Sequence, residues 1–498
     1  MNASLPIGAI ALLLAPAITH AAPCESLTSL ALPGGAITSA VSVPAGGLAT
    51  TNARGTAALA NLPAFCRVSA TLRPTADSDI KMELWLPNTT DWNGKYEANG
   101  NGGWTGSIST TTLAAGLRRG YAASMSDLGH EGSSASFAVG HPEKLIDYGY
   151  RAAHEMTVAS KAIVAAYYTR APKYSYWSGC SAGGRSAMME AQRYPDDFDG
   201  IVAGAPGLNW TGRATQAMWI DQAAHKDDAS YIPPAKYAVV HEAVLAACDA
   251  KDGAKDGVLE DPTRCKFDPH ELLCKGADDG KCLTAPQVET ARAIYATVIN
   301  PRTKQVFSPG SERGSELGWA TMAGPNPFTI GWDYFRYVVF NDPEWKPGHL
   351  NFDSDMERAA ANDHTLNAMD PNLRQFLSHG KLIQYHGWAD PQIAPSNSTN
   401  YYQSVVKEMG GAAKINGSYR LFMVPGMAHC GGGDGVSTFD MIAPLEQWVE
   451  AGKAPDQIPA SRVRNGKADR TRPLCPWPQL ATYKGSGSVD DAANFTCK

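Results

Sequence analysis

Apolar runs of strand length alternate with helix-like stretches in two separate parts of the chain. The alternation covers residues 60–207 and resumes at Lys381. Residues 82–86 and 121–126 predict strands, and residues 147–166 predict a long helix. Strands that alternate with helices are typical of an α/β fold with a parallel sheet. We therefore expect an α/β domain that is interrupted in the middle of its chain.

The sequence Gly179-Cys180-Ser181-Ala182-Gly183 matches the G-x-S-x-G pattern of a nucleophile elbow. A strand-like run, residues 174–177, precedes it, and a helix-compatible run, residues 184–193, follows it. The pattern requires this context of strand, sharp turn and helix. It predicts Ser181 as a nucleophile, and the alternative is an ordinary turn serine between glycines.

Cysteines adjoin two candidate catalytic residues. Cys430 is the only cysteine in the sequence that directly follows a histidine, and Cys180 directly precedes Ser181. If His429 is the general base for Ser181, the two side chains must approach within about 3 Å. Their cysteine neighbours are then also close, and bridged cysteines have Cα atoms about 5.5 to 6 Å apart. The pattern therefore predicts a Cys180–Cys430 disulfide.

The third member of a triad follows an apolar run that begins at Lys381 and ends in a turn at Asp390. A similar run, residues 419–424, is followed by the turn that carries His429. The chain order Ser, Asp, His is that of α/β-hydrolases. Asp390 can also be read as a turn former before a proline. His386 is the nearest rival base, although it has no cysteine neighbour.

Acyl transfer also needs hydrogen-bond donors for the oxyanion. In an α/β-hydrolase one donor is the backbone N–H after the nucleophile, which here belongs to Ala182. The second donor should come from a loop after an early strand. Gly102 and Gly103 fit because glycine lets the backbone approach a substrate closely. The choice between them stays open, as does a simple surface turn.

The segment between the two α/β parts, residues 208–375, is rich in Asp, Pro, Gly, Trp and Cys. It predicts helices at residues 234–247 and 285–295 but few strands. Asp249, Asp252 and Asp256 lie in this segment on a glycine-containing turn, which suits a hard cation with oxygen ligands. A solvated acidic loop is about as good an interpretation, because two lysines partly neutralise it.

Composition narrows the function classes and indicates export. Of the 498 residues 18% are charged, the formal net charge is −6, and there is no long basic run, which disfavours nucleic-acid binding. Residues 1–21 read as a cleaved signal peptide, whose apolar run, residues 7–18, is too short to span a bilayer. No lysine or arginine precedes this run, which leaves an uncleaved anchor as the alternative. The ten cysteines then predict disulfides in an extracellular or periplasmic protein that has no membrane anchor after cleavage. The oligomeric state stays open.

These motifs together resemble the tannase and feruloyl esterase family, which also includes the enzyme that hydrolyses mono(2-hydroxyethyl) terephthalate. The resemblance rests first on Cys180-Ser181, Asp390 and His429-Cys430, and it extends from Cys24 almost to the C-terminus. Four further segments carry it: residues 99–104, 140–144, 194–200 and 483–488.

The resemblance implies an α/β-hydrolase fold with a large inserted lid domain. The expected division is residues 22–207 and 376–498 for the catalytic domain and residues 208–375 for the lid. The family holds a structural Ca²⁺ ion in its lid, which implies ligation by the Asp249, Asp252 and Asp256 side chains and by the carbonyls of Ala254 and Val258. Locality and the resemblance also imply four more disulfides: Cys24–Cys66, Cys248–Cys265, Cys274–Cys282 and Cys475–Cys497.

The implied activity is hydrolysis of carboxylic esters of aromatic acids, with a feruloyl esterase as the first expectation. A tannase that cleaves galloyl esters and a hydrolase of mono(2-hydroxyethyl) terephthalate are alternatives within the family. Trp319, Phe328 and Arg336 are candidate substrate contacts of the lid. Ile393 stands where the terephthalate enzyme has a phenylalanine, which ranks that substrate lower. A hypothesis of another class is a non-catalytic secreted binding protein on a hydrolase scaffold.

Overall fold

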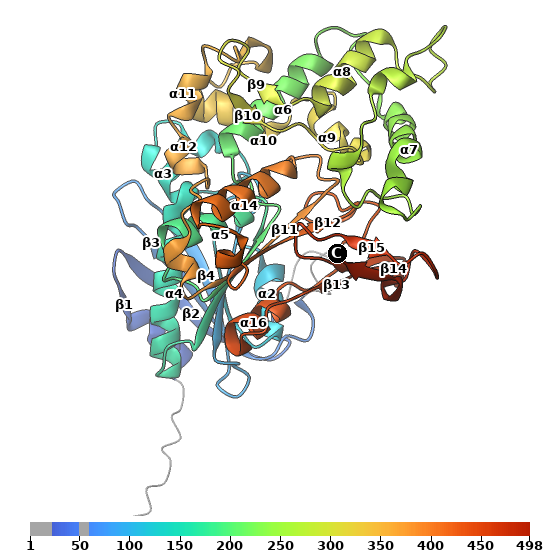
Figure 1. Cartoon of the computed structure of the whole chain (residues 1–498). Coiled ribbons are helices and arrows are strands. Elements are labelled where there is room, and N and C mark those ends of the chain that lie inside the picture. The colour runs from blue at the N-terminus through green and yellow to red at the C-terminus, as the bar shows by residue number, and fades with distance from the viewer. Residues whose placement is uncertain (1–21, 49–58) are drawn as a thin grey trace, which may run out of the picture.

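A computed structural model describes residues 22–48 and 59–498 of the chain (Figure 1). The expected signal peptide lies outside these residues. A ten-stranded mixed sheet forms the centre of the molecule. Its strands, in spatial order, are β1 (Ala31–Leu32), β2 (Gly35–Val43), β3 (Phe65–Leu72), β4 (Ile80–Pro87), β6 (Ala122–Ser126), β5 (Lys95–Asn99), β7 (Tyr174–Cys180), β8 (Gly200–Gly204), β11 (Lys381–Gly387) and β12 (Tyr419–Val424).

Burial along the strands follows from their position in this sheet. From β6 to β12 neighbouring strands pair in parallel, and every residue of β6 and β8 is buried. Strands covered on both faces are expected to be continuously apolar. Strand β2 pairs antiparallel with its neighbours near the edge of the sheet, and only Ile37 and Ala40 of its residues are buried.

Helices cover both faces of the sheet (Figure 1). Helices α2 (Thr110–Arg118) and α16 (Ile442–Ala451) bury their apolar side chains in two small clusters on one face. Helices α4 (Ala152–Tyr168), α5 (Ala182–Arg193) and α14 (Ser396–Glu408) pack into the large core on the other face. This arrangement of layers confirms the predicted α/β class.

The long helix expected at residues 147–166 begins with a wide turn. Residues Asp147–Arg151 form a π-helical turn before α4 begins. The carbonyls of Tyr148 and Gly149 accept hydrogen bonds from the buried Arg185 guanidinium at 3.0 and 2.9 Å. Arg185 belongs to α5, so the wide turn is bonded to that helix. A π turn of this kind is a local departure from the regular hydrogen bonds of an α-helix.

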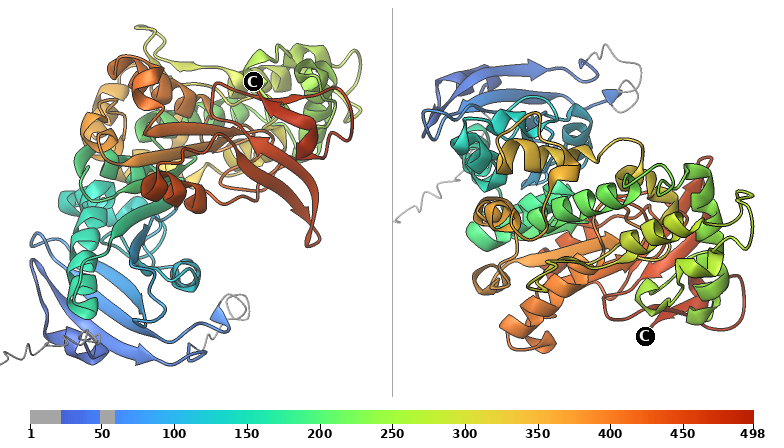
Figure 2. Two further views of the ribbon diagram at one scale, coloured as in Figure 1. Left: turned by 60° about the horizontal axis from the view of Figure 1, so that its bottom comes forward. Right: turned by 90° about the horizontal axis from the view of Figure 1, so that it is seen from above.

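The segment between β8 and β11 forms a helical layer over one end of the sheet (Figure 2). The helix expected at residues 285–295 has those bounds, and the one expected at 234–247 is a 3₁₀ turn followed by α7. The main elements of the segment between β8 and β11 are α6 (Trp210–Ala224), α7 (Tyr237–Cys248), α8 (Ala285–Tyr295), β9 (Val298–Ile299), β10 (Val306–Ser308), α9 (Ala320–Ala323), α10 (Thr329–Asp333), α11 (Met356–Ala360), α12 (Asp363–Leu366) and α13 (Arg374–Leu377). We call residues 208–375 the lid segment.

The C-terminal strands lie outside the main sheet. Strands β13 (Ile458–Arg464) and β14 (Lys467–Leu474) form a hairpin, and β15 (Ala481–Tyr483) pairs with β16 (Phe495–Cys497). Arg472 of β14 pairs with Asp256 of the lid segment, and the Ala481 N–H donates to Glu260 at 2.8 Å. These hairpins therefore join the C-terminal part to the lid segment. Within residues 22–48 and 59–498, no helix combines the length and the apolarity that a membrane span requires.

Candidate active site

Ser181 stands at a sharp turn between β7 and α5. Its φ of +63° is unusual for a residue with a side chain. The turn is tight because backbone segments meet without side chains between them. A Cβ on Gly184 would lie 2.3 Å from the Gly204 carbonyl oxygen, and the Ser181 N–H donates to that same oxygen at 2.9 Å. The local sequence thus forms the elbow that the motif predicts.

The loop after β11 carries Asp390, whose side chain is fully buried. Oδ1 of this carboxylate accepts hydrogen bonds from the N–H groups of Gln392 at 2.7 Å and Ile393 at 3.0 Å. Oδ2 lies 2.6 Å from Nδ1 of His429. The two backbone donors fix the carboxylate, and the imidazole approaches its other oxygen.

The loop that carries His429 packs directly on the loop of Asp390. The Ala389 N–H donates to the Met427 carbonyl at 3.0 Å, and a Cβ on Gly387 would lie only 2.2 Å from that oxygen. The Cys180–Cys430 disulfide joins the His429 loop to the elbow, with Cα atoms 6.0 Å apart. This confirms the predicted bridge.

Ser181 is nearly buried, with 7% of its surface exposed. Within the described part of the chain, its Oγ makes no hydrogen bond to the His429 imidazole. Catalytic hydrogen bonds of this kind are often long without substrate and tighten when it binds. The Cys180–Cys430 bridge brings the elbow of Ser181 to the loop of His429, and the contact between Asp390 and His429 is already formed.

The carboxyl of Asp390 is held in its ionised form. Burial alone raises the pKa of such a group, but the neighbouring imidazoles of His429 and His386 outweigh burial and hold the pKa of Asp390 well below its usual range. An ionised, oriented carboxylate is what a histidine general base requires as its partner.

His386 also contacts Asp390, which the sequence did not reveal. Its Nε2 lies 3.1 Å from Oδ2 of Asp390, and its Nδ1 lies 2.7 Å from Oγ of Ser398. The spacing of four residues placed His386 near Asp390 only as a rival base. Because its side chain has no exposed surface, a substrate cannot reach it in this conformation.

The loop after β5 runs against the elbow. A Cβ on Gly100 would lie 2.4 Å from the Gly183 Cα, so the two backbones touch. The N–H groups of Ala182, Gly102 and Gly103 have no acceptor within the described residues. The first N–H groups of a helix lack intrahelical partners, which leaves the Ala182 N–H available beside Ser181.

The two candidate loop glycines differ in their surroundings. A Cβ on Gly102 would meet nothing within 4 Å, whereas Gly103 has a φ of +51° and faces the Ile330 side chain. The Gly103 carbonyl accepts the Tyr148 hydroxyl at 2.5 Å, which anchors the loop. Both N–H groups remain free, so the geometry retains both candidates.

The four residues named as substrate contacts have different environments. Trp319 is 2% exposed and packs between the rings of Tyr237 and Tyr295, as a core residue does. Arg336 is paired with Asp333 at 2.7 Å. Ile393 is buried with its Cδ1 close to Gly207, the residue whose N–H donates to the Ser181 carbonyl. Phe328 is half-buried beside Arg213.

Arg213 is a buried cation that no sequence signal indicated. Its guanidinium lies 5.3 Å from the ring centres of both Trp210 and Phe328, and its Nε donates to the Gln392 carbonyl at 3.2 Å. Burial lowers the pKa of Arg213 to about 10, while the Asp390 carboxylate opposes this shift. Arg213 therefore adds positive charge near Asp390.

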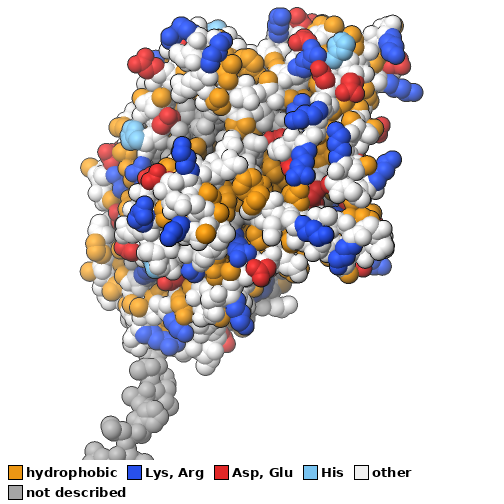
Figure 3. Space-filling view, viewed as in Figure 1, with side chains coloured by type: hydrophobic (Ala, Val, Ile, Leu, Met, Phe, Trp, Pro, Cys, Tyr) orange, Lys and Arg blue, Asp and Glu red, His pale blue; other side chains and the backbone are white. Residues whose placement is uncertain are grey.

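A cavity of about 310 Å³ separates the lid segment from the loops of Asp390 and His429. Ala389 and Ala428, the chain neighbours of those two residues, line it from below, and His241 and Ser315 line it from the lid segment. Ligand sites of small molecules begin at about this volume. Figure 3 shows apolar side chains gathered on the face where the lid segment meets the hydrolase domain.

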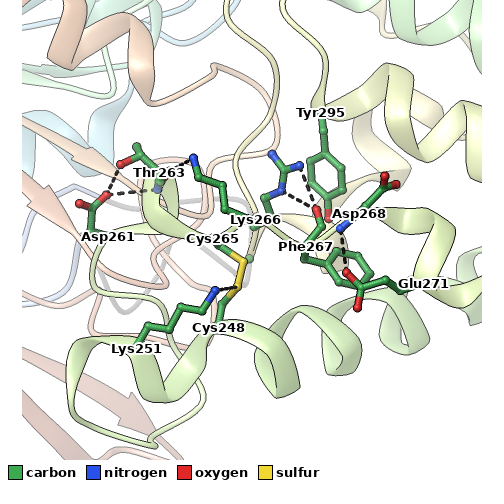
Figure 4. Close-up of a disulfide and its surroundings, with 12 residues drawn as sticks. Cys248, Lys251, Asp261, Thr263, Cys265, Lys266, Phe267, Asp268, Glu271 and Tyr295 are labelled. Carbon is green, nitrogen blue, oxygen red and sulfur yellow. Dashed lines mark hydrogen bonds between the residues drawn. A yellow bond between two sulfur atoms is a disulfide. The ribbon is translucent and has the colours of Figure 1, made fainter.

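The acidic loop of the lid segment is ordered by its own backbone. Asp249 accepts hydrogen bonds from the N–H groups of Asp256 and Gly257, and Asp252 accepts from those of Ala254 and Glu260. The Cys248–Cys265 disulfide braces the loop at the end of α7 (Figure 4). The loop is therefore a defined turn.

The loop carries oxygen groups of the kind that a calcium ion takes as ligands, but the Asp249, Asp252 and Asp256 carboxylates do not form a group within 4.8 Å of one another among the described residues. Burial raises the pKa values of Asp249 and Asp252. A cation bound beside these two carboxyls would favour their ionised forms. The carbonyls of Ala254 and Val258 accept no hydrogen bond within the described residues. Carboxylate and carbonyl oxygens are the ligands that Ca²⁺ prefers. Asp256 already pairs with Arg472, so an ion would share this carboxylate.

All ten cysteines are paired. The four disulfides expected from locality and resemblance are present in addition to Cys180–Cys430, and no cysteine is free.

Comparisons with known proteins give a consistent result. The sequence profile of the family described as tannase and feruloyl esterase matches residues 66–498. An uncharacterized esterase of Xanthomonas campestris pv. campestris is 40% identical, over 99% of this chain and 93% of that protein. Feruloyl esterase B of Aspergillus niger is 31% identical, over 87% of this chain and 86% of that protein.

Solved structures share the fold. The crystal structure of feruloyl esterase B from Aspergillus oryzae matches with a TM-score of 0.88 at 29% identity, over 95% of this chain and 99% of that chain. Tannin acyl hydrolase from Aspergillus niger matches with a TM-score of 0.79 at 23% identity, over 95% and 94% of the two chains. The predicted α/β-hydrolase fold is thereby confirmed.

The contact between Gly100 and Gly183 yields a first prediction. Gly100→Ala should lower the thermal stability and the ester hydrolysis of the protein, because its Cβ would overlap the Gly183 backbone. We expect a loss of about 1 to 3 kcal/mol, as for other overpacked sites. Gly417→Ala is the control, since a Cβ there meets nothing within 4 Å. Equal unfolding midpoints for the two variants would contradict the prediction.

The bridge between the elbow and the His429 loop yields a second prediction. Replacing Cys180 and Cys430 together with serine should lower kcat about a hundredfold while circular dichroism stays near that of the wild type, because a shift of about 1 Å at a catalytic group has this effect. The control replaces Cys274 and Cys282, which close a short loop. Wild-type turnover without the Cys180–Cys430 bridge would show that the loops keep their places unaided.

Proposed function

Because the chain belongs to the tannase and feruloyl esterase family and is a carboxylic ester hydrolase, we propose that it is a secreted serine esterase for esters of aromatic acids. The observation that carries the proposal is the meeting of three loops at one place. Ser181 stands at an elbow, Asp390 contacts His429 at 2.6 Å, and the Cys180–Cys430 bridge joins the elbow to the loop of His429. The relatives named above are esterases, which argues against a non-catalytic binding protein.

In the proposed reaction Ser181 Oγ attacks the ester carbonyl carbon and passes its proton to Nε2 of His429. The tetrahedral intermediate carries an oxyanion, which the Ala182 N–H and the N–H of Gly102 or Gly103 would bind. Loss of one such donor typically raises the barrier by about 3 to 4 kcal/mol. His429 then gives the proton to the leaving alcohol, and an acyl-enzyme remains on Ser181.

Water completes the proposed cycle. His429 removes a proton from a water molecule that attacks the acyl-enzyme, and the acid leaves as Ser181 regains its proton. Asp390 keeps the imidazole in the tautomer with its proton on Nδ1 and stabilises the imidazolium while it exists. His386 is the less suitable base because it is fully buried and both of its ring nitrogens are hydrogen-bonded.

The acid part of the substrate is the finer question. Feruloyl esterases stand among the relatives and the matching structures, which supports a hydroxycinnamoyl ester. Galloyl and terephthaloyl monoesters are the alternatives. Ile393 offers no aromatic face where the terephthalate enzyme is expected to have one, so we rank that ester last. Ile330 lies against Gly103 and Phe328 lies beside Arg213, and these are the aliphatic and aromatic surfaces that we assign to the acyl group.

Secretion is part of the proposal. Five disulfides use every cysteine of the chain, and disulfides persist in oxidising compartments. The apolar N-terminal segment has the length of a signal peptide.

We also propose that the lid loop binds a structural Ca²⁺ ion through Asp249, Asp252, Asp256 and the carbonyls of Ala254 and Val258. An ion there would act on stability and on the position of the His429 loop. Val258 packs on Gly426, three residues before His429, because a Cβ on Gly426 would lie 2.5 Å from Val258 Cγ1. The ester chemistry itself needs no metal when Ser181 supplies the nucleophile.

The proposed nucleophile can be tested with a fluorophosphonate probe. The wild type should be labelled, and Ser181→Ala should lose both labelling and hydrolysis. Ser404→Ala is the matched control, because among the described residues the hydroxyl of this serine bonds only to the Tyr401 carbonyl of its own helix, α14, and its loss should leave labelling intact. Labelling of the Ser181→Ala variant would refute the assignment.

Substrate comparison tests the acyl group. Methyl ferulate should show a higher kcat/KM than methyl gallate, and mono(2-hydroxyethyl) terephthalate should show the lowest value. The opposite order between ferulate and gallate would make the protein a tannase.

The calcium proposal predicts a response to chelation. EDTA should lower the melting temperature of the wild type and added Ca²⁺ should restore it, because a ligand bound only by the folded state stabilises that state. Triple substitution of Asp249, Asp252 and Asp256 by Asn should remove the response. A control variant with Asp278 and Asp279 changed to Asn, on another acidic turn, should keep it. An unresponsive wild type that contains no metal would end the calcium proposal.

A further inference from the structure

His386 is a buried histidine whose hydrogen bonds lead into the candidate triad. Its side chain has no exposed surface. Nε2 lies 3.1 Å from Oδ2 of Asp390 and 3.2 Å from the Ile393 carbonyl, while Nδ1 lies 2.7 Å from Oγ of Ser398. A side chain needed only to fill space would not use three polar partners, since a buried polar group is costly unless it is bonded.

The partners decide the tautomer of His386. The two oxygens near Nε2 belong to an ionised carboxylate and a carbonyl, and both can only accept hydrogen bonds. Nε2 therefore carries the proton. The Ser398 hydroxyl lies 2.7 Å from Nδ1, the other ring nitrogen, and a hydroxyl can donate to that nitrogen or accept from it. Ser398 lies in the first turn of α14, and its Oγ makes no other hydrogen bond within the described residues.

The result is a chain of hydrogen bonds that runs from Ser398 through His386 to Asp390. In its last step the Nε2–H of His386 donates to Asp390. His429 donates to the same oxygen, Oδ2, at 2.6 Å. The other oxygen accepts two backbone N–H groups from the residues after Pro391. Four donors therefore hold the carboxylate, and a rotation of the group would break all four bonds.

We propose that His386 is a positioning residue for ester hydrolysis, which holds Oδ2 of Asp390 where it receives the His429 N–H. The inference rests on the proposed roles of Ser181, Asp390 and His429. His386 acts through Asp390 and does not touch the reacting atoms. Its Nε2–H also draws some of the carboxylate charge away from His429.

This charge sharing gives the proposal a pH signature. The groups that face Asp390 are His386, His429, two backbone N–H groups and, more distantly, Arg213. Without the His386 N–H, more negative charge faces His429 and favours its protonated form. His429 must be neutral to accept the serine proton. The acid limb of kcat/KM should therefore move to higher pH.

The test uses His386→Leu, which removes the N–H, and His386→Gln, whose side-chain amide can donate near the position of Nε2. We expect His386→Leu to lower kcat about 10- to 100-fold, since small misplacements of a catalytic group have this effect. KM should stay within about twofold, because no substrate contact is lost. The acid limb should rise by about half a pH unit, and His386→Gln should recover most of kcat.

Two further variants separate positioning from stability. Ser398→Ala removes the hydrogen-bond partner of Nδ1 and keeps the ring, so it should lower kcat by about threefold to tenfold even if His386→Leu folds poorly. His154→Leu is the matched control, because it removes another histidine–aspartate hydrogen bond, the 2.6 Å contact between His154 on helix α4 and Asp197. The control should change the melting temperature and leave the acid limb in place.

The outcomes distinguish the inference from the function on which it rests. Hydrolysis by Ser181→Ala would refute the proposed nucleophile itself. If Ser181→Ala is inactive while His386→Leu and Ser398→Ala both keep the wild-type kcat and acid limb, only the role of His386 is overturned. The same conclusion follows if the Leu and Gln variants lose kcat equally and in proportion to their melting temperatures.

Discussion

The Cys180–Cys430 disulfide is the constraint on which the candidate site depends. Cys180 ends β7, whereas Cys430 follows β12, and two strands, β8 and β11, lie between them in the sheet. Neighbouring strands lie about 4.8 Å apart, so the ends of β7 and β12 are separated by about 14 Å. The Cα atoms of the two cysteines are nevertheless 6.0 Å apart. The loop after β12 must therefore fold back across the sheet, and closing a loop of 250 residues restricts the unfolded chain by about 5 kcal/mol in the chain-entropy model.

The rest of the site follows from this return of the chain. The His429 loop passes over the Asp390 loop, where the carbonyl of Met427 contacts both Gly387 and Ala389. The lid segment rests on the same loops, since Gly318 touches Pro391 and Val258 touches Gly426. Local order in the lid segment, from the Cys248–Cys265 bridge and from any bound cation, can thus reach His429 through packing alone. The C-terminal hairpin closes the assembly through the Arg472–Asp256 pair.

The sequence revealed those parts of the molecule that depend on neighbouring residues or on a covalent bond. The elbow, the strands at β4, β6, β11 and β12, and the helix at residues 285–295 have patterns that a short window contains. The Cys180–Cys430 pair followed from one geometric argument: if Ser181 and His429 approach each other, their cysteine neighbours must do so as well. Strands β2 and β5 were not predicted, because β2 mixes small and polar residues without a regular alternation and β5 has polar residues at three of its five positions. The contact of His386 with Asp390 and the burial of Arg213 depend on tertiary packing. Contacts between segments that are distant in the chain, such as that of Arg213 with Gln392, leave no signal in a short stretch of sequence.

The most direct test of the account is a crystal structure of the protein after reaction with an aromatic phosphonate ester. We expect one covalent bond, from Ser181 Oγ to phosphorus, with Nε2 of His429 within hydrogen-bond distance of an oxygen on phosphorus. A second phosphonyl oxygen should accept the N–H of Ala182 and that of Gly102 or Gly103, which would also decide between the two glycines. Phosphorus bonded to another residue, or a phosphonyl oxygen that faces away from these N–H groups, would contradict the account.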